Sequence, residues 1–191
     1  MRLLKALAAG LALGLLSLPV SAGVFTITSP GPLDSQFPIT IQIDNADGFD
    51  LLKATFDLSG TEAAAPGIQP LIIDGDPFNI VGPPGGTATF FSISDTVFGF
   101  NFTGFNNGET FSFDWDPDIA GDTLYGAEVI EQLGMLITLN TAGGAVGGTL
   151  EVDSDQSGLI AIIQSPVPEP ASLALLGAAL AGLAFARRSL S

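Results

Sequence analysis

The sequence contains no cysteine and no histidine. Without cysteine there is no disulfide, no thiol nucleophile and no thiolate metal site, so the core must hold without covalent cross-links. Without histidine the chain lacks the usual general base of serine hydrolases and the usual zinc or iron ligand. These two absences exclude most nucleophilic and metal-dependent enzyme classes, and we expect a protein that is not an enzyme.

Basic residues are also scarce, with Lys and Arg together numbering 5 against 20 Asp and Glu. Four of the five lie at the extreme ends, so Lys53 is the single cation between Gly23 and Val167. Binding to nucleic-acid phosphates depends on Lys and Arg, and a body this acidic therefore excludes nucleic acid as a partner. The same charge keeps the body soluble and attracts divalent cations.

Other routes to catalysis find little support in the residues that are present. A Ser–Lys pair would have to use Lys53, which lies in the middle of a predicted strand on the solvent side. Paired carboxylates can act as acid and base in a glycosidase. With so many acidic residues in the body, however, a close pair is expected by chance, and its presence carries no information about activity.

The N-terminus has the three parts of a secretory signal peptide. A short cationic start with Arg2 and Lys5 precedes an apolar run over 7–18, and Pro19 ends that run. The small residues of Val20-Ser21-Ala22 then fit a cleavage site. We expect export through the Sec translocon, cleavage by signal peptidase and a mature chain that begins at Gly23.

The middle of the chain predicts an all-β fold, because apolar residues alternate at period two. The pattern covers 37–44, 52–58, 98–102 and 111–115, and further β-like runs occupy 24–29, 68–74, 87–94, 123–131, 134–140, 148–153 and 158–164. The alternation places Leu52, Ala54, Phe56 and Leu58 on one buried face. Turns rich in Gly, Pro, Asn and Asp separate the runs, which favours an antiparallel β-sandwich or jelly roll. A β-helix solenoid is the alternative, although no fixed repeat period is present.

The C-terminus combines a short Pro-rich stretch, an apolar segment over 171–185 and the pair Arg187-Arg188. A helix of that length spans roughly 24 Å, slightly less than a membrane's hydrocarbon core. The two arginines are expected to stay in the cytoplasm, which leaves the body outside that membrane. We expect five parts: a signal peptide (1–22), a β domain (23–164), a Pro-rich linker (165–170), a transmembrane helix (171–186) and a basic cytoplasmic tail (187–191).

Pro168-Glu169-Pro170, followed by the apolar segment and the Arg pair, resembles the PEP-CTERM sorting signal of Gram-negative bacteria. The resemblance implies that an exosortase, a membrane-embedded cysteine transpeptidase, recognises Pro168, Glu169 and Pro170 while the helix holds the chain in the membrane. It also implies a tail-anchored intermediate in the inner membrane, followed by delivery to the cell surface or extracellular matrix. The same tail is sometimes labelled an ice-binding protein C-terminal domain, a label that gives no evidence of ice binding.

Calcium is the candidate ligand of the body, because it prefers several carboxylate oxygens presented by loops. Asp114, Asp116, Asp118 and Asp122 alternate as the ligands of a calcium loop do, but without the Gly and Glu of an EF-hand. Asp153 and Asp155, in the run 153–158, form a weaker candidate. The alternative is that these residues serve turns and solubility, for which Asp is well suited.

Two functions fit this sequence. The first is a noncatalytic surface or matrix component associated with exopolysaccharide and biofilm, an association that the PEP-CTERM resemblance implies. The second is a carbohydrate-binding or adhesive module ordered by calcium, for which Trp115 and Tyr125 are the candidate exposed aromatic residues. The phenylalanines are expected in the core.

Overall fold

The computed structural model describes residues 23–36, 38–61, 70–119, 127–165 and 180. Gly23–Ser165 forms one compact unit. The predicted signal peptide, the transmembrane segment other than residue 180, and the basic tail lie outside the described residues. In the part of the chain that is described, no helix has the length and apolar character needed to cross a membrane.

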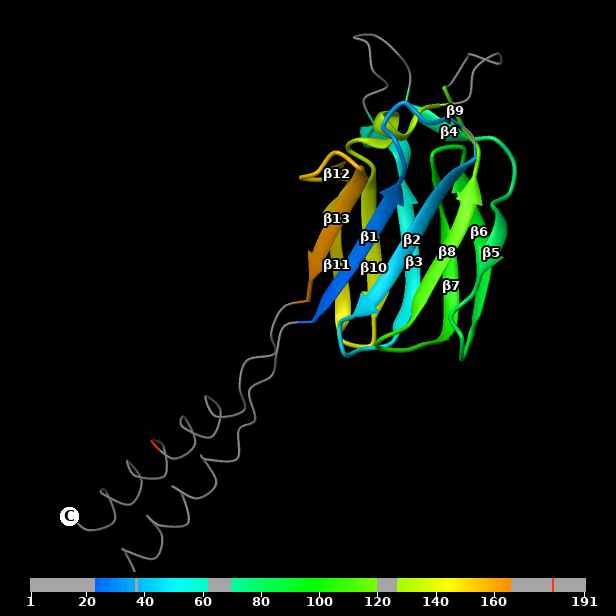
Figure 1. Cartoon of the computed structure of the whole chain (residues 1–191). Helices are drawn as coiled ribbons and strands as arrows, with labels where there is room; N and C mark the ends of the chain where they lie inside the picture. Colours follow the sequence, from blue (N-terminus) through cyan, green and yellow to red (C-terminus); the bar gives the residue numbers. More distant parts are fainter. Residues whose placement is uncertain (1–22, 37, 62–69, 120–126, 166–179, 181–191) are drawn as a thin grey trace, which may run out of the picture. The chain divides into compact units, whose positions relative to one another are not determined.

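The described unit consists of antiparallel strands arranged mainly in two sheets, which are stacked face to face (Figure 1). In the six-stranded sheet the order is β12 (Glu151–Val152), β13 (Gly158–Gln164), β1 (Val24–Pro30), β2 (Ile39–Ala46), β8 (Thr110–Trp115) and β5 (Phe78–Val81). In the five-stranded sheet it is β11 (Gly144–Thr149), β10 (Leu136–Thr141), β3 (Leu51–Asp57), β7 (Val97–Phe105) and β6 (Thr87–Ser94). A small third sheet pairs β4 (Leu71–Ile73) with β9 (Pro117–Ile119). The predicted all-β, antiparallel class is confirmed.

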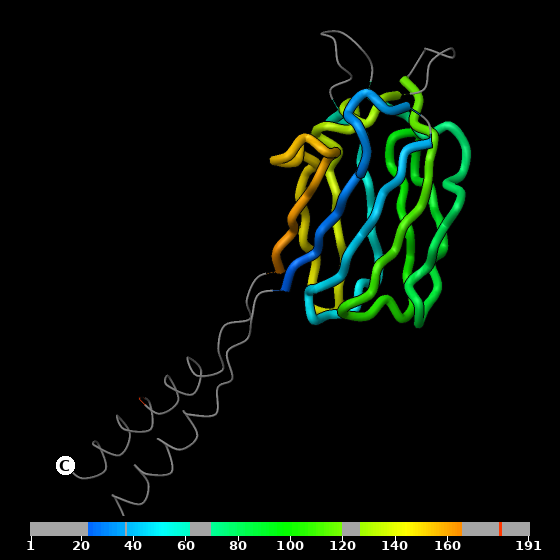
Figure 2. Tube along the Cα trace, viewed as in Figure 1, coloured from blue at the N-terminus to red at the C-terminus, as the bar shows by residue number. Residues whose placement is uncertain are grey.

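The first and last strands of the unit lie side by side. β1 pairs with β13 in antiparallel register from Val24 opposite Gln164 to Pro30 opposite Gly158. Figure 2 shows this pair as neighbouring blue and orange traces. The start of β1 and the end of β13 are therefore at the same end of the sheet.

The period-two pattern identifies the buried faces of β2 and β8 correctly. Ile39, Ile41 and Ile43 are buried in β2, whereas the residues between them are partly exposed. Phe111 and Phe113 are buried in the same way in β8, which pairs with β2. Alternation of apolar and polar residues thus produces one solvent-facing and one buried face, as expected for a sheet covered on one side.

Aromatic rings from both sheets meet in a single core. Phe98 of β7 lies 5.0 Å, between ring centroids, from Phe56 of β3 in its own sheet and 5.2 Å from Trp115 of β8 in the other. The Phe56 ring meets Phe113 edge to face at 5.6 Å. These contacts bury large apolar areas and hold the sheets together. The predicted core role of the phenylalanines holds for the following eight, all of them buried: Phe25, Phe56, Phe98, Phe100, Phe102, Phe105, Phe111 and Phe113.

The predicted face of β3 is wrong at one position. Ala54, Phe56 and Leu58 are buried, but the side chain of Leu52 is 48% exposed and Leu51 takes the core position. The pairings of β3 with both of its neighbours shift register between Leu51 and this stretch. An irregularity of this kind reverses the side to which the preceding residues point.

The strand predicted over 123–131 is also not observed in the described part of that segment. Residues Val129–Gln132 form a 3₁₀ turn, η2, which the Glu131 carboxylate stabilises by accepting a hydrogen bond from the Glu128 N–H at 2.7 Å. Residues 120–126 lie outside the described residues. A second 3₁₀ turn, η1, covers Leu58–Gly60. The sequence pattern predicts neither β5 nor β9. It covers only the end of β11, because the glycines of that strand give a weak strand signal.

Candidate functional site

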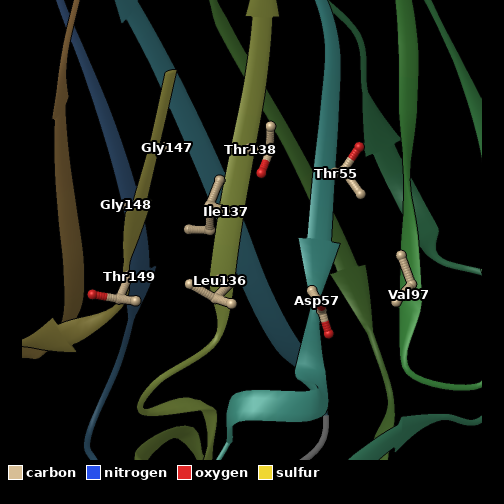
Figure 3. A pocket seen from close by; sticks show the side chains of 9 residues that line it. All are labelled: Thr55, Asp57, Val97, Leu136, Ile137, Thr138, Gly147, Gly148 and Thr149. Atoms are coloured by element: carbon tan, nitrogen blue, oxygen red, sulfur yellow. The ribbon is translucent and has the colours of Figure 1, made fainter. Parts of the chain in front are cut away.

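A shallow, open groove lies on the outer face of the five-stranded sheet, with a volume of about 410 Å³. Its walls come from neighbouring strands (Figure 3). β3 contributes Thr55 and Asp57, and β10 contributes Leu136 and Thr138. The remaining lining residues are Val97, Ile137, Gly147, Gly148 and Thr149.

The hollow lies at Gly147 of β11, which faces the outer side of the sheet, whereas a side chain on the adjacent Gly148 would point inward against Ile163. Gly147 lies opposite Thr138 and Gly148 lies opposite Ile137 in the β10–β11 pairing. Because glycine has no side chain, this part of the outer face is lower than the threonines beside it. The groove therefore presents hydroxyl groups, one carboxylate and the half-exposed Leu136. This chemistry suits hydrogen bonding to a polar ligand, and no aromatic side chain lines it.

The predicted calcium-loop residues lie at the end of β8 and in β9. The Asp114 carboxylate accepts hydrogen bonds from Thr40 Oγ1 at 2.6 Å and from Asn79 Nδ2 at 2.8 Å. Asp118 lies in β9 opposite Ile72. Asp122 is outside the described residues. Asp114 thus bonds to neighbouring strands, which leaves its oxygens less available to a cation.

Asp116 has acidic neighbours from two segments. Burial, the charge of Asp118 and the charge of Asp74 raise the pKa of Asp116, in that order of importance. Asp74 is held in place because its N–H donates to the Asp116 carbonyl oxygen at 3.1 Å. Sequence reasoning missed Asp74 as a neighbour because only the β4–β9 pairing brings the two segments together.

The structure describes no group of three or more acidic side chains arranged to hold a metal ion, within the ranges given above. One of the predicted ligands, Asp122, lies outside those ranges. Calcium binding at Asp114–Asp122 therefore stays a prediction.

Replacing Asp116 with Asn is expected to raise the melting temperature slightly at pH 7. The raised pKa means that the ionised Asp116 carboxylate destabilises the folded state. The protonated carboxyl group does not have this effect. The folded state therefore loses stability as the pH rises through the folded-state pKa of Asp116. The Asn variant avoids that loss, and we expect a gain of about 1–2 °C because the site is largely solvated. Below about pH 3 the carboxyl is protonated in both states and the difference should vanish.

Calorimetry of the mature protein at the two pH values tests this prediction. Asp34→Asn is a suitable control, because Asp34 is exposed and distant in sequence from the acidic group. A gain that is the same at both pH values would show that charge repulsion is not the cause.

The second calcium candidate is a hairpin turn between β12 and β13. The Asp153 carboxylate accepts the Ser154 N–H at 2.6 Å, and the Asp155 carboxylate accepts the Ser157 N–H at 2.9 Å. The side-chain and backbone hydrogen bonds of Ser157 lower the pKa of Asp155. Gln156 has a positive φ of 59°. These carboxylates hold the turn together, which is the alternative role considered for them.

The candidate aromatic ligand platform is wrong for Trp115, whose side chain is 1% exposed and packs in the core. Tyr125 lies outside the described residues. The predicted sorting residues Pro168, Glu169, Pro170, Arg187 and Arg188 also lie outside them, so their role depends on the sequence match alone.

No curated protein and no solved structure matches the chain. A family model described as the PEP-CTERM protein-sorting motif matches residues 166–188. The matched segment begins directly after Ser165, where the compact unit ends. It contains the Pro-Glu-Pro tripeptide, the apolar segment and both arginines. The chain is therefore a protein with a C-terminal PEP-CTERM sorting motif, exported and sorted to the cell envelope by an exosortase-type system.

Proposed function

We propose that the two-sheet body is a noncatalytic component of the cell surface or extracellular matrix of a Gram-negative bacterium. Its route includes an inner-membrane intermediate anchored by the segment 171–186 and processed by an exosortase. The observation that carries the proposal is the sorting motif at 166–188, which begins where the β domain ends. The motif supports delivery of the domain outside the cytoplasm, and it follows the domain directly in the sequence.

The residues available for chemistry support a noncatalytic role. The whole sequence lacks histidine and cysteine. Lys53, the single cation of the domain, places its Nζ 4.5 Å from the centre of the Phe91 ring. The Lys53 ammonium thus contacts an aromatic face in a cation–π interaction. The groove, in turn, is shallow and open, whereas catalysis favours sites that exclude water.

The groove favours the second candidate, a carbohydrate-binding or adhesive module. Thr55, Thr138 and Thr149 offer hydroxyl groups and Asp57 offers a carboxylate, spread over three strands. Sugar hydroxyls form hydrogen bonds with such groups. Because the groove is open and lies on the face of a sheet, it suits an extended polymer better than a small molecule.

Fractionation of the producing cells tests the proposal. We expect the mature protein in the extracellular polymer fraction, where it is accessible to added protease. Recovery in the cytoplasm or as a free periplasmic protein would contradict delivery to the surface.

The purified mature protein is then mixed with the organism's own extracellular polysaccharide, first with calcium and then with chelator. Binding that is lost in chelator would favour the calcium-ordered adhesive module. Binding in both conditions would favour a calcium-independent module, and absence of binding would favour a structural component without a carbohydrate ligand.

A further inference from the structure

Asp47, in the turn between β2 and β3, has a buried carboxylate without a partner. Its side chain is 4% exposed, and neither Oδ1 nor Oδ2 accepts a hydrogen bond. The carboxylate has no cationic neighbour among the described residues, since Lys53 lies over Phe91. Burial of an unpaired charge is costly, and such groups are normally paired or hydrogen-bonded. The position of Asp47 therefore calls for a cation or donor that the described chain does not supply.

The backbone of Gly23 lies against this carboxylate. Val24 pairs with Ala46, so the register of β1 and β2 brings the preceding residue Gly23 opposite Asp47. A Cβ built on Gly23 would overlap the Asp47 carbonyl oxygen, its Cα and its carboxylate Oδ1. The Gly23 nitrogen is bonded to the same Cα, about 1.46 Å away, and it lies within a few ångströms of Oδ1.

The carbonyl group of Gly23 is also fixed in place. Its carbonyl oxygen accepts the Ser165 N–H at 3.1 Å, and the residue is buried. With the carbonyl held, the nitrogen can still move by rotation about the bond between Cα and the carbonyl carbon. A side chain at this position would push the backbone away from Asp47, which explains why the residue is a glycine.

Gly23 is the residue at which signal peptidase is expected to leave the new N-terminus. Hydrolysis adds one water across the Ala22–Gly23 peptide bond: the C–N bond breaks, Ala22 gains a carboxylate, and the Gly23 nitrogen becomes an α-amine. At neutral pH an α-amine binds a proton and carries a positive charge. Cleavage thus creates, within reach of Asp47, the cation that the folded domain otherwise lacks.

We propose that the α-ammonium group of Gly23 forms a buried ion pair with the Asp47 carboxylate once the signal peptide is removed. In the precursor, the same nitrogen is an uncharged amide and cannot neutralise the carboxylate. The domain therefore reaches its full stability only after cleavage, on the outer side of the membrane. This inference depends on the predicted cleavage site and is independent of the function proposed for the groove.

The test uses the mature protein purified from the producing cells. N-terminal sequencing first establishes that the chain begins at Gly23. The α-amine is then acylated near neutral pH, once in the native state and once in denaturant. Because the ion pair keeps the amine protonated and buried, we expect the native rate to be at least about tenfold lower than the denatured rate.

Asp47→Asn is the diagnostic variant, because Asn has the same shape without the charge. It should remove most of this protection and lower the melting temperature, whereas Asp50→Asn, at an exposed position in the same turn, should change neither. If Asp47→Asn fails to fold, titration of the α-amine in the folded wild type decides the matter, because an ion pair raises the pKa of that amine whereas burial alone lowers it. A mature chain that begins elsewhere, or equal rates in the two states, would overturn the proposal. Protection that persists in a folded Asp47→Asn variant would also overturn it, because burial without the ion pair would then be sufficient.

Discussion

Replacement of Pro168, Glu169 and Pro170 by three alanines is expected to reduce the processed, surface-located form of the protein by at least about tenfold. The sequence Pro-Glu-Pro combines a single carboxylate with two prolines, residues that lack an N–H group and restrict φ. Three alanines retain neither the restricted backbone nor the charge that a sorting enzyme can recognise. The apolar segment 171–186 and the two arginines are unchanged, so the uncleaved protein should accumulate in the inner membrane.

Membrane fractionation with an antibody to the β domain measures this outcome. The matched control is Pro166→Ala, the same chemical change two residues upstream of the tripeptide, which should be processed normally. Normal processing of the triple variant would remove the sorting role from Pro168, Glu169 and Pro170. Faulty processing of the control would extend the recognised segment upstream.

The largest effect on stability is expected for Phe98→Ala. The Phe98 side chain is fully buried and contacts rings on both sheets, including Phe56 at 5.0 Å and Trp115 at 5.2 Å. Truncation leaves a cavity between the sheets and removes these ring contacts, which should cost about 3–5 kcal/mol of unfolding free energy. Such a loss is a large fraction of the stability of an ordinary domain. We expect a fall in melting temperature of about 10 °C or more in a calorimetric scan.

Phe91→Ala provides the comparison on the opposite face of the same sheet. The Phe91 ring covers Gly99 across the β6–β7 pair and lies under the Lys53 ammonium. Its loss removes one cation–π contact and some packing, at an expected cost of about 1 kcal/mol. If the two variants lost equal stability, the core between the sheets would not be the main source of stability that its contacts indicate.

Most of the strand pattern is predictable because burial on one face leaves a direct trace in the sequence. Ile39, Ile41 and Ile43 alternate with polar residues, and the structure buries them as the pattern indicates. The reversed face at Leu52 was not predictable, because it arises from a register shift relative to two partner strands. Such irregularities depend on pairings that connect distant parts of the chain.

The candidate sites follow the same division. The sequence pointed to Asp114 and Asp116 as alternating acidic residues, and both are partly buried, Asp114 in β8 and Asp116 directly after it. The proximity of Asp74 to Asp116 required the β4–β9 pairing, and the groove required Gly147 to lie opposite Thr138 of β10. Neither arrangement has a local signal, because each depends on which strands become neighbours.

The place of β13 in the sheet determines how the domain bears mechanical load. The C-terminal segment continues from this strand, so a tether at that end transmits tension to β13 first. Seven residue pairs join β13 to β1, from Val24–Gln164 to Pro30–Gly158, and β12 pairs with its other edge. The hydrogen bonds between antiparallel strands run perpendicular to the strand axis. A pull directed along β13 therefore shears these bonds together instead of opening them one at a time, and rupture requires several to break at once.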